Sequence, residues 1–320
     1  MAQIGYHASH EQFSPSDLLK WVVMAEEAGF EAINSSDHFH PWGESQGQSG
    51  FSFAWLGAAM QATKLPFGMV CAPGQRYHPA IVAQAIGTLA QMFPGRFSAS
   101  LGSGEALNEN ITGERWITKE ERNGRLQESV SVIKRLLEGE FVTHRGRVVV
   151  QEAKLYTRPE IQPLLLGAAV TKKTAAWMGG WTDGLVTVSR PVSELREVIE
   201  AYRTNGGEGK PIHLKVQLSY DQTEEKAVDG AYEQWRNNVL PSDILDDLWQ
   251  VSQFDAAGSL VKKEDMKDMV LISSDIDQFA QWINEYIDLG FDRIILHNVN
   301  REQEGFIRDF GEKLLPKLRK

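Results

Sequence analysis

Short runs of apolar residues alternate with longer amphipathic runs along the whole chain. The short runs have the length and composition of buried β-strands. We expect eight strands, at residues 5–8, 32–36, 67–72, 97–101, 164–167, 185–188, 213–218 and 294–297. The runs between them predict helices; the first begins after Ser14 and Pro15, a cap followed by a first-turn proline, and carries Leu18, Val22 and Ala25 at helical spacing.

Eight strands joined by helical crossovers predict an α/β fold, the (β/α)8 TIM barrel, because parallel neighbours need long right-handed connections. The alternative is a doubly wound open sheet, but the first strand lacks a G-x-G-x-x-G turn. The chain has 320 residues, more than the roughly 250 of a typical barrel. We expect insertions after strands four and seven, a hairpin at residues 141–156 and an acidic helical segment at residues 221–275. No linker divides the chain, which predicts one domain over residues 1–320.

Charge and cysteine content narrow the class of partner. The chain has 33 basic and 43 acidic residues, a formal net charge of −10, which argues against nucleic acid or an anionic membrane as the main partner. Its single cysteine, Cys71, excludes an intramolecular disulfide and fits a reducing cytoplasm. The N-terminus shows no signal peptide, and no apolar run reaches the ~20 residues of a membrane helix. We therefore expect a cytoplasmic protein that acts on a small molecule.

A cluster of polar and aromatic residues follows the second predicted strand. Asp37, His38, His40 and Trp42 lie within six consecutive positions there. These side chains are too polar or too bulky to be packing residues by default. The carboxyl ends of parallel strands are where α/β folds keep their chemistry, which favours a functional role. The alternatives are that Asp37 caps a turn and that Trp42 packs under a lid.

Other predicted β-to-α loops carry further candidates. Glu11 lies in the loop after strand one, and Ser103, Gly104, Glu105 and Asn108 follow strand four. A third loop, residues 71–79, follows strand three. A barrel brings such loops together at one mouth, which predicts a shared site. The glycines alone would also suit a tight turn.

The two histidines leave a second chemical class open. His38 and His40 alternate like zinc ligands, and Asp37 and Glu105 could complete a set, so a metal-dependent hydrolase is the competing class. The neighbouring Trp42 and glycine-containing loop suit a flat organic ring better than an ion, and we predict no metal. A non-enzymatic binding barrel is the third alternative.

Motifs in these loops resemble those of the luciferase-like flavin oxidoreductase superfamily. They include Ser36-Asp37-His38-Phe39 with Pro41-Trp42, Gly104-Glu105-Ala106-Leu107-Asn108-Glu109 with Thr112-Gly113, and Arg125-Leu126 before Glu128-Ser129-Val130. The likeness runs in order from residue 3 to the C-terminus. Within the superfamily the chain is most similar to the glucose-6-phosphate dehydrogenases that use the deazaflavin coenzyme F420. Such relatives are commonly dimers, which implies a homodimer.

The resemblance implies a role for each loop residue. Catalysis would involve His38 as acid/base, Glu105 as a second acid/base opposite it, Trp42 as a shield of the hydride path and Glu11 as a group that orients His38 or the substrate. The cofactor would be held by Asp37, Val70, Cys71, Ser103, Gly104, Asn108, Gly167, Ala168 and Ala169. In these enzymes a bulge behind the ring, often with a non-prolyl cis peptide, falls at Val70–Cys71.

One departure from this group concerns the substrate. The sugar-phosphate enzymes hold the phosphate with basic residues, and at those places this chain has Pro191, Asp255 and Met269. A dianionic phosphate needs Arg or Lys within contact. We therefore predict that glucose-6-phosphate is a poor substrate, with Arg190 and the Lys262-Lys263 pair as the nearby basic residues.

A second departure concerns the cofactor. The glycine pair that meets the phosphate tail of the coenzyme reads Ala169-Val170 here. On this basis we expect FMN in preference to F420, with F420 as the alternative. With FMN the reduced ring could meet O₂, and the enzyme would be a monooxygenase. With F420 it would be a hydride-transferring dehydrogenase or reductase, because a deazaflavin does not activate oxygen.

Overall fold

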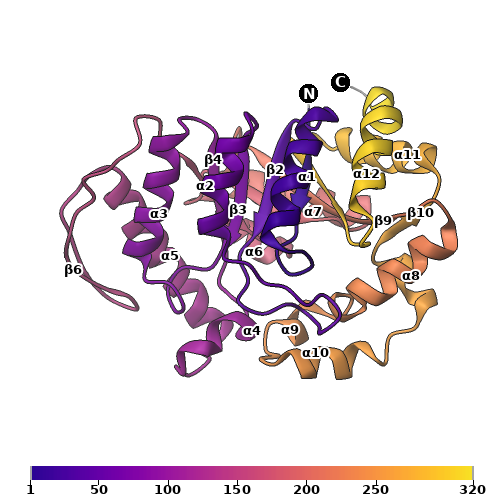
Figure 1. The fold of residues 1–320 in the computed structure, drawn as a ribbon. Coiled ribbons are helices and arrows are strands. Elements are labelled where there is room, and N and C mark those ends of the chain that lie inside the picture. The colour runs from indigo at the N-terminus through magenta and orange to yellow at the C-terminus, as the bar shows by residue number, and fades with distance from the viewer. Residues whose placement is uncertain (1, 319–320) are drawn as a thin grey trace.

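The structure is a computed structural model that describes residues 2–318, except for the side chains of residues 242 and 243. Parallel strands close into a barrel within this range (Figure 1). The strands of the closed barrel, in order around it, are β1 (Gln3–Ala8), β2 (Ala32–Ser36), β3 (Phe67–Cys71), β4 (Phe97–Leu101), β7 (Leu164–Ala168), β8 (Gly184–Val188), β9 (Ile212–Tyr220) and β11 (Arg293–Asn298). The predicted TIM barrel is confirmed, and each expected strand is present with ends that differ by at most two residues.

Helices surround the barrel as the amphipathic pattern predicts. They are α1 (Pro15–Glu27), α2 (Ser52–Ala62), α3 (Pro79–Met92), α4 (Ala106–Glu109), α5 (Lys119–Leu137), α6 (Lys172–Gly179), α7 (Val192–Tyr202), α11 (Ile276–Ile287) and α12 (Gln303–Asp309). In α1 the Ser14 hydroxyl accepts a hydrogen bond from the backbone N–H of Asp17, and Leu18, Val22 and Ala25 are buried. No helix in the described range has the length and apolar character needed to cross a membrane.

Both predicted insertions are present. The first is an antiparallel hairpin of β5 (Val142–Arg145) and β6 (Val149–Ala153), which projects from the left of the barrel in Figure 1. The second contains α8 (Glu224–Trp235), α9 (Ser242–Leu245) and α10 (Val251–Gly258) and runs along the lower edge of that view. It also contains a strand that the sequence pattern did not predict, β10 (Leu271–Ser273), which pairs in parallel with the end of β9. Three residues are too few to show a periodicity.

The two faces of each barrel strand meet different surroundings. In β9, Leu214, Val216 and Leu218 are buried in the apolar core. The alternate residues Lys215 and Gln217 line a cavity inside the barrel. This alternation follows from the two-residue period of a strand, which turns successive side chains to opposite faces. The barrel interior near its mouth is therefore polar.

The cis peptide predicted at Val70–Cys71 is wrong, because the described peptide bonds are all trans. The backbone there belongs to two regular parallel ladders, in which Ser36 pairs with Val70 and Cys71 pairs with Leu101. The Val70 carbonyl accepts a hydrogen bond from the Asp37 N–H, and the Cys71 carbonyl accepts one from the Gly102 N–H. An extended trans backbone satisfies both carbonyls.

Candidate active site

A cavity of about 710 Å³ opens at the carboxyl ends of the barrel strands. It is lined by nearly all of the residues that the resemblance assigns to catalysis or to the cofactor: Glu11, Asp37, His38, Trp42, Val70, Cys71, Ser103, Gly104, Glu105, Asn108, Ala168 and Ala169. Gly167 is the exception, since a Cβ built on it would lie 2.3 Å from the sulfur of Met178 on α6. The β-to-α loops thus converge as expected, although they are far apart in the sequence.

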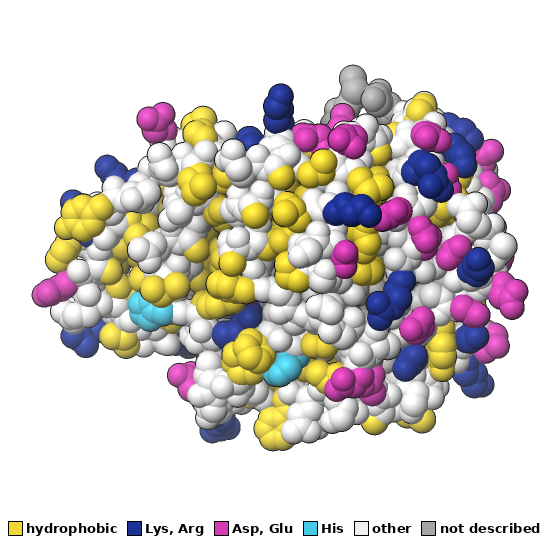
Figure 2. All heavy atoms as spheres, viewed as in Figure 1, with side chains coloured by type: hydrophobic (Ala, Val, Ile, Leu, Met, Phe, Trp, Pro, Cys, Tyr) yellow, Lys and Arg dark blue, Asp and Glu magenta, His cyan; other side chains and the backbone are white. Residues whose placement is uncertain are grey.

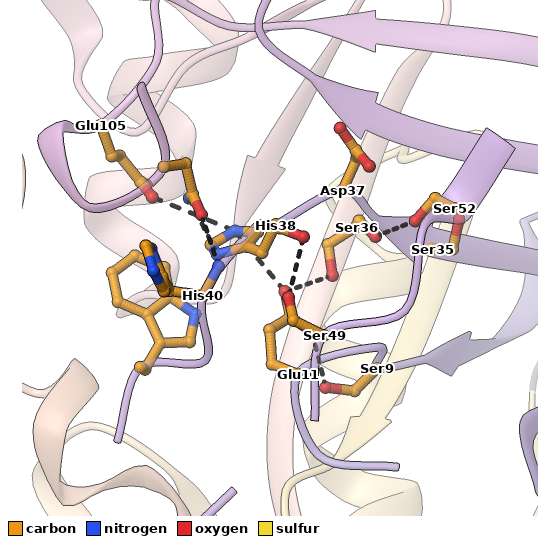
Figure 3. A network of polar contacts seen from close by, with 12 residues as sticks. Ser9, Glu11, Ser35, Ser36, Asp37, His38, His40, Ser49, Ser52 and Glu105 are labelled. Carbon is orange, nitrogen blue, oxygen red and sulfur yellow. Dashed lines mark hydrogen bonds and ion pairs between the residues drawn. The ribbon is translucent and has the colours of Figure 1, made fainter. Parts of the chain in front are cut away.

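At the centre of the cavity, the His38 ring lies between two carboxylates (Figure 3). Its Nε2 is 3.5 Å from Oε1 of Glu11 and 4.0 Å from Oε2 of Glu105. Glu11 also accepts hydrogen bonds from the hydroxyls of Ser9 (2.9 Å) and Ser36 (2.6 Å). Burial tends to raise the pKa of Glu11, but His38 and the Ser36 hydroxyl outweigh it and lower that pKa. Glu11 is therefore an ionised carboxylate that faces the edge of the imidazole.

Asn108 determines which ring nitrogen of His38 carries the proton. Its Oδ1 accepts hydrogen bonds from the backbone N–H groups of Phe39 (2.8 Å) and His40 (3.3 Å). The amide NH₂ of Asn108 must therefore face Nδ1 of His38, at 3.0 Å, and donate to it. The hydrogen-bond network thus assigns the neutral ring its proton on Nε2. The resemblance placed Asn108 on the cofactor; the structure adds that it holds His38.

Burial separates the protonation states of the two candidate acid/base groups. It lowers the pKa of His38, although Glu11 opposes the change. Burial and, after it, the nearby carboxylate of Asp246 raise the pKa of Glu105 to about 8. Near neutral pH the imidazole is therefore uncharged while Glu105 carries a proton. A pair of groups whose environments push their pKa values apart is typical of acid/base sites.

The Asp37 side chain is part of a buried ionic cluster in the cavity wall. Its Oδ2 accepts a hydrogen bond of 2.9 Å from Nη2 of Arg76. The Arg76 Nε lies 3.5 Å from Oε1 of Glu109, and the Arg76 backbone N–H donates to the other oxygen of Glu109 at 2.8 Å. Arg76 thereby ties the loop after β3 to the loops after β2 and β4. Asp37 holds the wall together in addition to lining the cavity.

Trp42 is packed by the second insertion. It is buried with Leu107 and Phe254, and its ring centroid lies 4.9 Å from that of His38 and 5.3 Å from that of Phe254. The backbone N–H of Ala106 donates to the Asp246 carbonyl at 3.0 Å and closes the same side. The indole N–H makes no hydrogen bond to any described residue and is available to a molecule in the cavity.

The side chains of the alternative zinc site do not converge. The Nδ1 of His40 is 2.8 Å from the carbonyl oxygen of Leu107, with which it forms a hydrogen bond. Among the side chains that the structure describes, no three His, Cys, Asp or Glu residues are arranged to hold a metal ion. The geometry therefore gives no support to the metal-dependent hydrolase.

Part of the cavity lining consists of small or apolar residues. It is built from Val70, Cys71, Ala72, Gly102, Gly104, Ala168 and Ala169. Gly104 has a φ of 82°, and a Cβ on it would lie 2.9 Å from Cγ of Glu109, so only glycine leaves this backbone open to the cavity. Burial raises the pKa of the Cys71 thiol well above its ordinary value, which disfavours the reactive thiolate. These residues fit a flat fused ring.

The fold and the site together define a class of protein: a parallel (β/α)8 barrel with a buried imidazole between two carboxylates in a cavity at its mouth. The luciferase-like monooxygenase family model matches residues 1–293, and the chain belongs to this family. A curated F420-dependent glucose-6-phosphate dehydrogenase of Microbacterium testaceum is 33% identical over 332 residues, which cover 99% of this chain and 98% of the relative. The corresponding enzyme of Beutenbergia cavernae is 32% identical over 330 residues, 100% of this chain and 98% of the relative.

Solved structures agree with this assignment. An F420-dependent secondary alcohol dehydrogenase, in complex with an F420-acetone adduct, is 31% identical, with a TM-score of 0.92 over 100% of this chain and 99% of that chain. The coenzyme F420-dependent tetrahydromethanopterin reductase of Methanopyrus kandleri shares the fold, with a TM-score of 0.77 at 19% identity over 99% of both chains. The protein is an oxidoreductase of the luciferase-like class.

Several cavity residues that lie on strands were not among the predicted site residues. They are His7 on β1, Lys215 and Gln217 on β9, and His297 on β11. The default interpretation of His7 and His297 is a hydrogen-bonded structural histidine. A signal existed in β9, where the polar residues His213, Lys215 and Gln217 alternate with apolar ones. Such alternation in a strand of a closed barrel, whose outer face is covered by helices, indicates a polar interior.

Proposed function

We propose that this protein is an F420-dependent dehydrogenase that interconverts a small secondary alcohol and the corresponding carbonyl compound. The observation that carries the proposal is the His38 ring held between Glu11 and Glu105, beside Trp42, in the cavity at the barrel mouth. The relative with the 0.92 TM-score, which is 31% identical over the whole chain, supports a secondary alcohol. The preference for FMN is not confirmed, since the relatives above 30% identity are named for F420.

The residues present fit the deazaflavin. The apolar lining that includes Val70, Cys71 and Ala168 suits the ring, and Ala169 and Thr174, near the start of α6, extend the cavity toward a helix N-terminus that favours a phosphate. When bound, F420 supplies a two-electron carbon centre that takes the hydride of the carbinol carbon and leaves the hydroxyl proton to the protein.

The side chains of this chain would handle that proton and the substrate oxygen. The Nε2–H of His38 and the free indole N–H of Trp42 are two donors for the oxygen. Glu105, with its pKa near 8, accepts the hydroxyl proton in its ionised form and returns it to a carbonyl in its protonated form. Glu11 stays ionised and orients the imidazole. Trp42 and the insertion keep water from the reacting atoms.

The cations around the cavity support a small alcohol in preference to a sugar phosphate. Asp255, at one expected phosphate position, accepts hydrogen bonds from Asn237 and from the backbone of Glu44. Of the nearby basic residues, Arg190 lies 3.6 Å from Glu194, and Lys263 lies outside the cavity, 2.7 Å from Asp229. Among the described residues of the cavity, no group of several unpaired cations is left to surround a dianionic phosphate.

The test uses the whole purified protein. Mixed with F420 and a secondary alcohol, it should bleach the absorbance of the oxidised deazaflavin. The rate of this bleaching should be ~10²-fold lower in His38→Ala. Binding of F420 is measured separately, by quenching of tryptophan fluorescence in the wild type and in His38→Ala. A protein that binds FMN and leaves F420 unbound would contradict the proposal.

The second candidate is an FMN-dependent monooxygenase. It is favoured by Ala169-Val170, which replace the glycine pair of the F420 group, and by the character of the family. It predicts that the protein is purified with a yellow flavin and consumes O₂ when that flavin is reduced. The titration with the two cofactors separates the candidates.

We also propose a cytoplasmic homodimer in which residues 1–320 form one domain. An apolar surface supports association: Figure 2 shows hydrophobic side chains over α2, α3 and the hairpin, and Phe51, Ile81, Phe141, Val149 and Tyr156 are exposed. Light scattering of the wild type should give twice the chain mass, and Ile81→Glu with Phe141→Glu should give the monomer. A single unfolding transition in calorimetry tests the single domain.

A further inference from the structure

Lys215 places an ammonium group inside the barrel. It lies in the middle of β9, in register with Val188 of β8 and Ile295 of β11. Because Leu214 and Val216 face the apolar core, the side chain of Lys215 points inward and lines the cavity. An ammonium group is seldom kept away from bulk water without a partner of opposite charge.

Lys215 differs from the other cations of the cavity in having no acidic partner. Each of the others is paired: Arg76 with Asp37 at 2.9 Å, Lys119 with Asp246 at 2.8 Å, Arg190 with Glu194 at 3.6 Å and Lys267 with Glu224 at 2.6 Å. Lys215 makes no hydrogen bond or ion pair with any residue that the structure describes. Its nearest recorded contact is the ring of Trp235, with Nζ 5.8 Å from the centroid.

Burial lowers the pKa of Lys215, and the charges of Glu11 and Glu105 oppose that change without forming an ion pair with it. Both oxygens of Glu11 are occupied by the hydroxyls of Ser9 and Ser36, and Oε1 also faces His38. Glu105 carries a proton up to about pH 8. The ammonium group therefore faces the cavity, close to the acid/base residues, as an unused binding element.

We propose that the substrate is a hydroxy monocarboxylic acid, or its oxo acid, whose carboxylate pairs with Lys215 while its carbinol oxygen lies at His38 and Trp42. This inference rests on the proposed alcohol dehydrogenase function and adds a binding contact, not a chemical step. One ammonium group balances one negative charge, whereas a phosphate dianion needs several cations.

The first test compares substrates that differ only in charge. With F420, the wild type should oxidise lactate or 3-hydroxybutanoate with a higher kcat/KM than the neutral methyl ester of the same acid. Whichever of the two acids is the better substrate indicates the preferred spacing between the carboxylate and the carbinol carbon. Lys215→Met keeps the shape of the side chain and removes the charge. It should lower kcat/KM for the acid by about 10²-fold, mostly through KM, and leave the ester within a few fold.

Lys267→Met is the matched control, since Lys267 also lines the cavity but is already paired with Glu224. It should leave the preference for the acid unchanged. If Lys215→Met does not fold, Lys215→Gln replaces it, and the comparison of acid with ester in the wild type needs no variant. Two results would overturn the inference while the proposed function stands. One is that Lys215→Met lowers kcat/KM equally for the acid and the ester. The other is that the wild type oxidises the ester as well as it oxidises the acid.

A binding measurement separates the two proposals. Calorimetry of pyruvate and 3-oxobutanoate with the cofactor-free protein should show binding to the wild type and to Lys267→Met, and none to Lys215→Met. The same pattern in a protein that reduces no F420 with any alcohol would support the carboxylate contact and contradict the proposed function. Binding that survives in Lys215→Met would contradict the contact itself.

Discussion

Replacing Asn108 by Asp tests whether this residue determines the proton position on His38. The change is nearly isosteric and keeps an oxygen for the backbone N–H groups of Phe39 and His40. It replaces the NH₂ that donates to Nδ1 of His38 by a carboxylate oxygen, which can only accept. The imidazole must then present an N–H at Nδ1, which favours the charged ring or the other neutral tautomer.

The expected magnitude follows from this contact. A hydrogen bond to a charged group contributes about 1.5–3 kcal/mol. Only 13% of the His38 side chain is exposed, so solvent screens the contact little. The protonation equilibrium of His38 should therefore move toward the charged form by about tenfold or more, since about 1.4 kcal/mol is a factor of ten. The pKa of His38, which burial lowers in the wild type, should rise.

The assay is nitrogen NMR of the protein with labelled histidine across the pH range. The wild type should show a neutral ring with its proton on Nε2, and Asn108→Asp should show a proton on Nδ1 and a higher pKa. Asn108→Leu is the comparison: it leaves two backbone N–H groups without an acceptor and should destabilise the fold by about 2–4 kcal/mol. An unchanged tautomer and pKa in Asn108→Asp would refute the reasoning.

Four further outcomes are expected. Glu105→Gln and His38→Ala should each retain folding stability and cofactor affinity, while turnover falls ~10²-fold; a variant that unfolds or keeps full activity would indicate a structural role. Burial and Asp246 raise the pKa of Glu105 to about 8, so its carboxyl group is protonated below that pH and ionised above it. Since the ionised form accepts the hydroxyl proton, the rate of alcohol oxidation should increase through pH 8. Glu105→Gln should not show this increase. Glucose-6-phosphate with saturating F420 should turn over slowly; rates that match a sugar-phosphate dehydrogenase would show that Arg190 binds phosphate. Cys71 should resist thiol reagents, since it is buried with a raised pKa, and rapid inactivation without protection by cofactor would contradict its placement.

The local pattern of the chain was enough to predict the barrel and the position of its site. Strands of five or six residues and helices such as the one at Leu18, Val22 and Ala25 have periods that can be counted. Closure of a parallel barrel places every β-to-α loop at one mouth, so residues such as His38 and Glu105 were expected to meet. A three-residue strand such as β10 has no period, and it formed because the neighbouring β9 offered an unpaired edge.

The structure agrees with the resemblance on where most of the assigned residues lie and disagrees with it on the backbone at Val70–Cys71. Twelve of the thirteen residues assigned to the site line the cavity, and Gly167 faces α6 instead. The cis peptide at Val70–Cys71 was inferred from relatives, but the hydrogen bonds that its two carbonyls make with Asp37 and Gly102 determine the conformation in this chain. Such bonds depend on the register of three strands, which a motif does not encode.

The sequence by itself determined the fold class, the edge of the barrel that carries the chemistry and the identity of its loop residues, because periodicity and strand order are local properties. Only the tertiary structure decided the states of those residues. Asn108 sets the proton of His38 from 70 positions away, and Asp246 in the second insertion raises the pKa of Glu105. Lys215 became a candidate only when the closed barrel showed that it alone among the described cavity cations lacks an acidic partner. Burial and charge partners are contributed by segments far apart in the chain, and protonation depends on both.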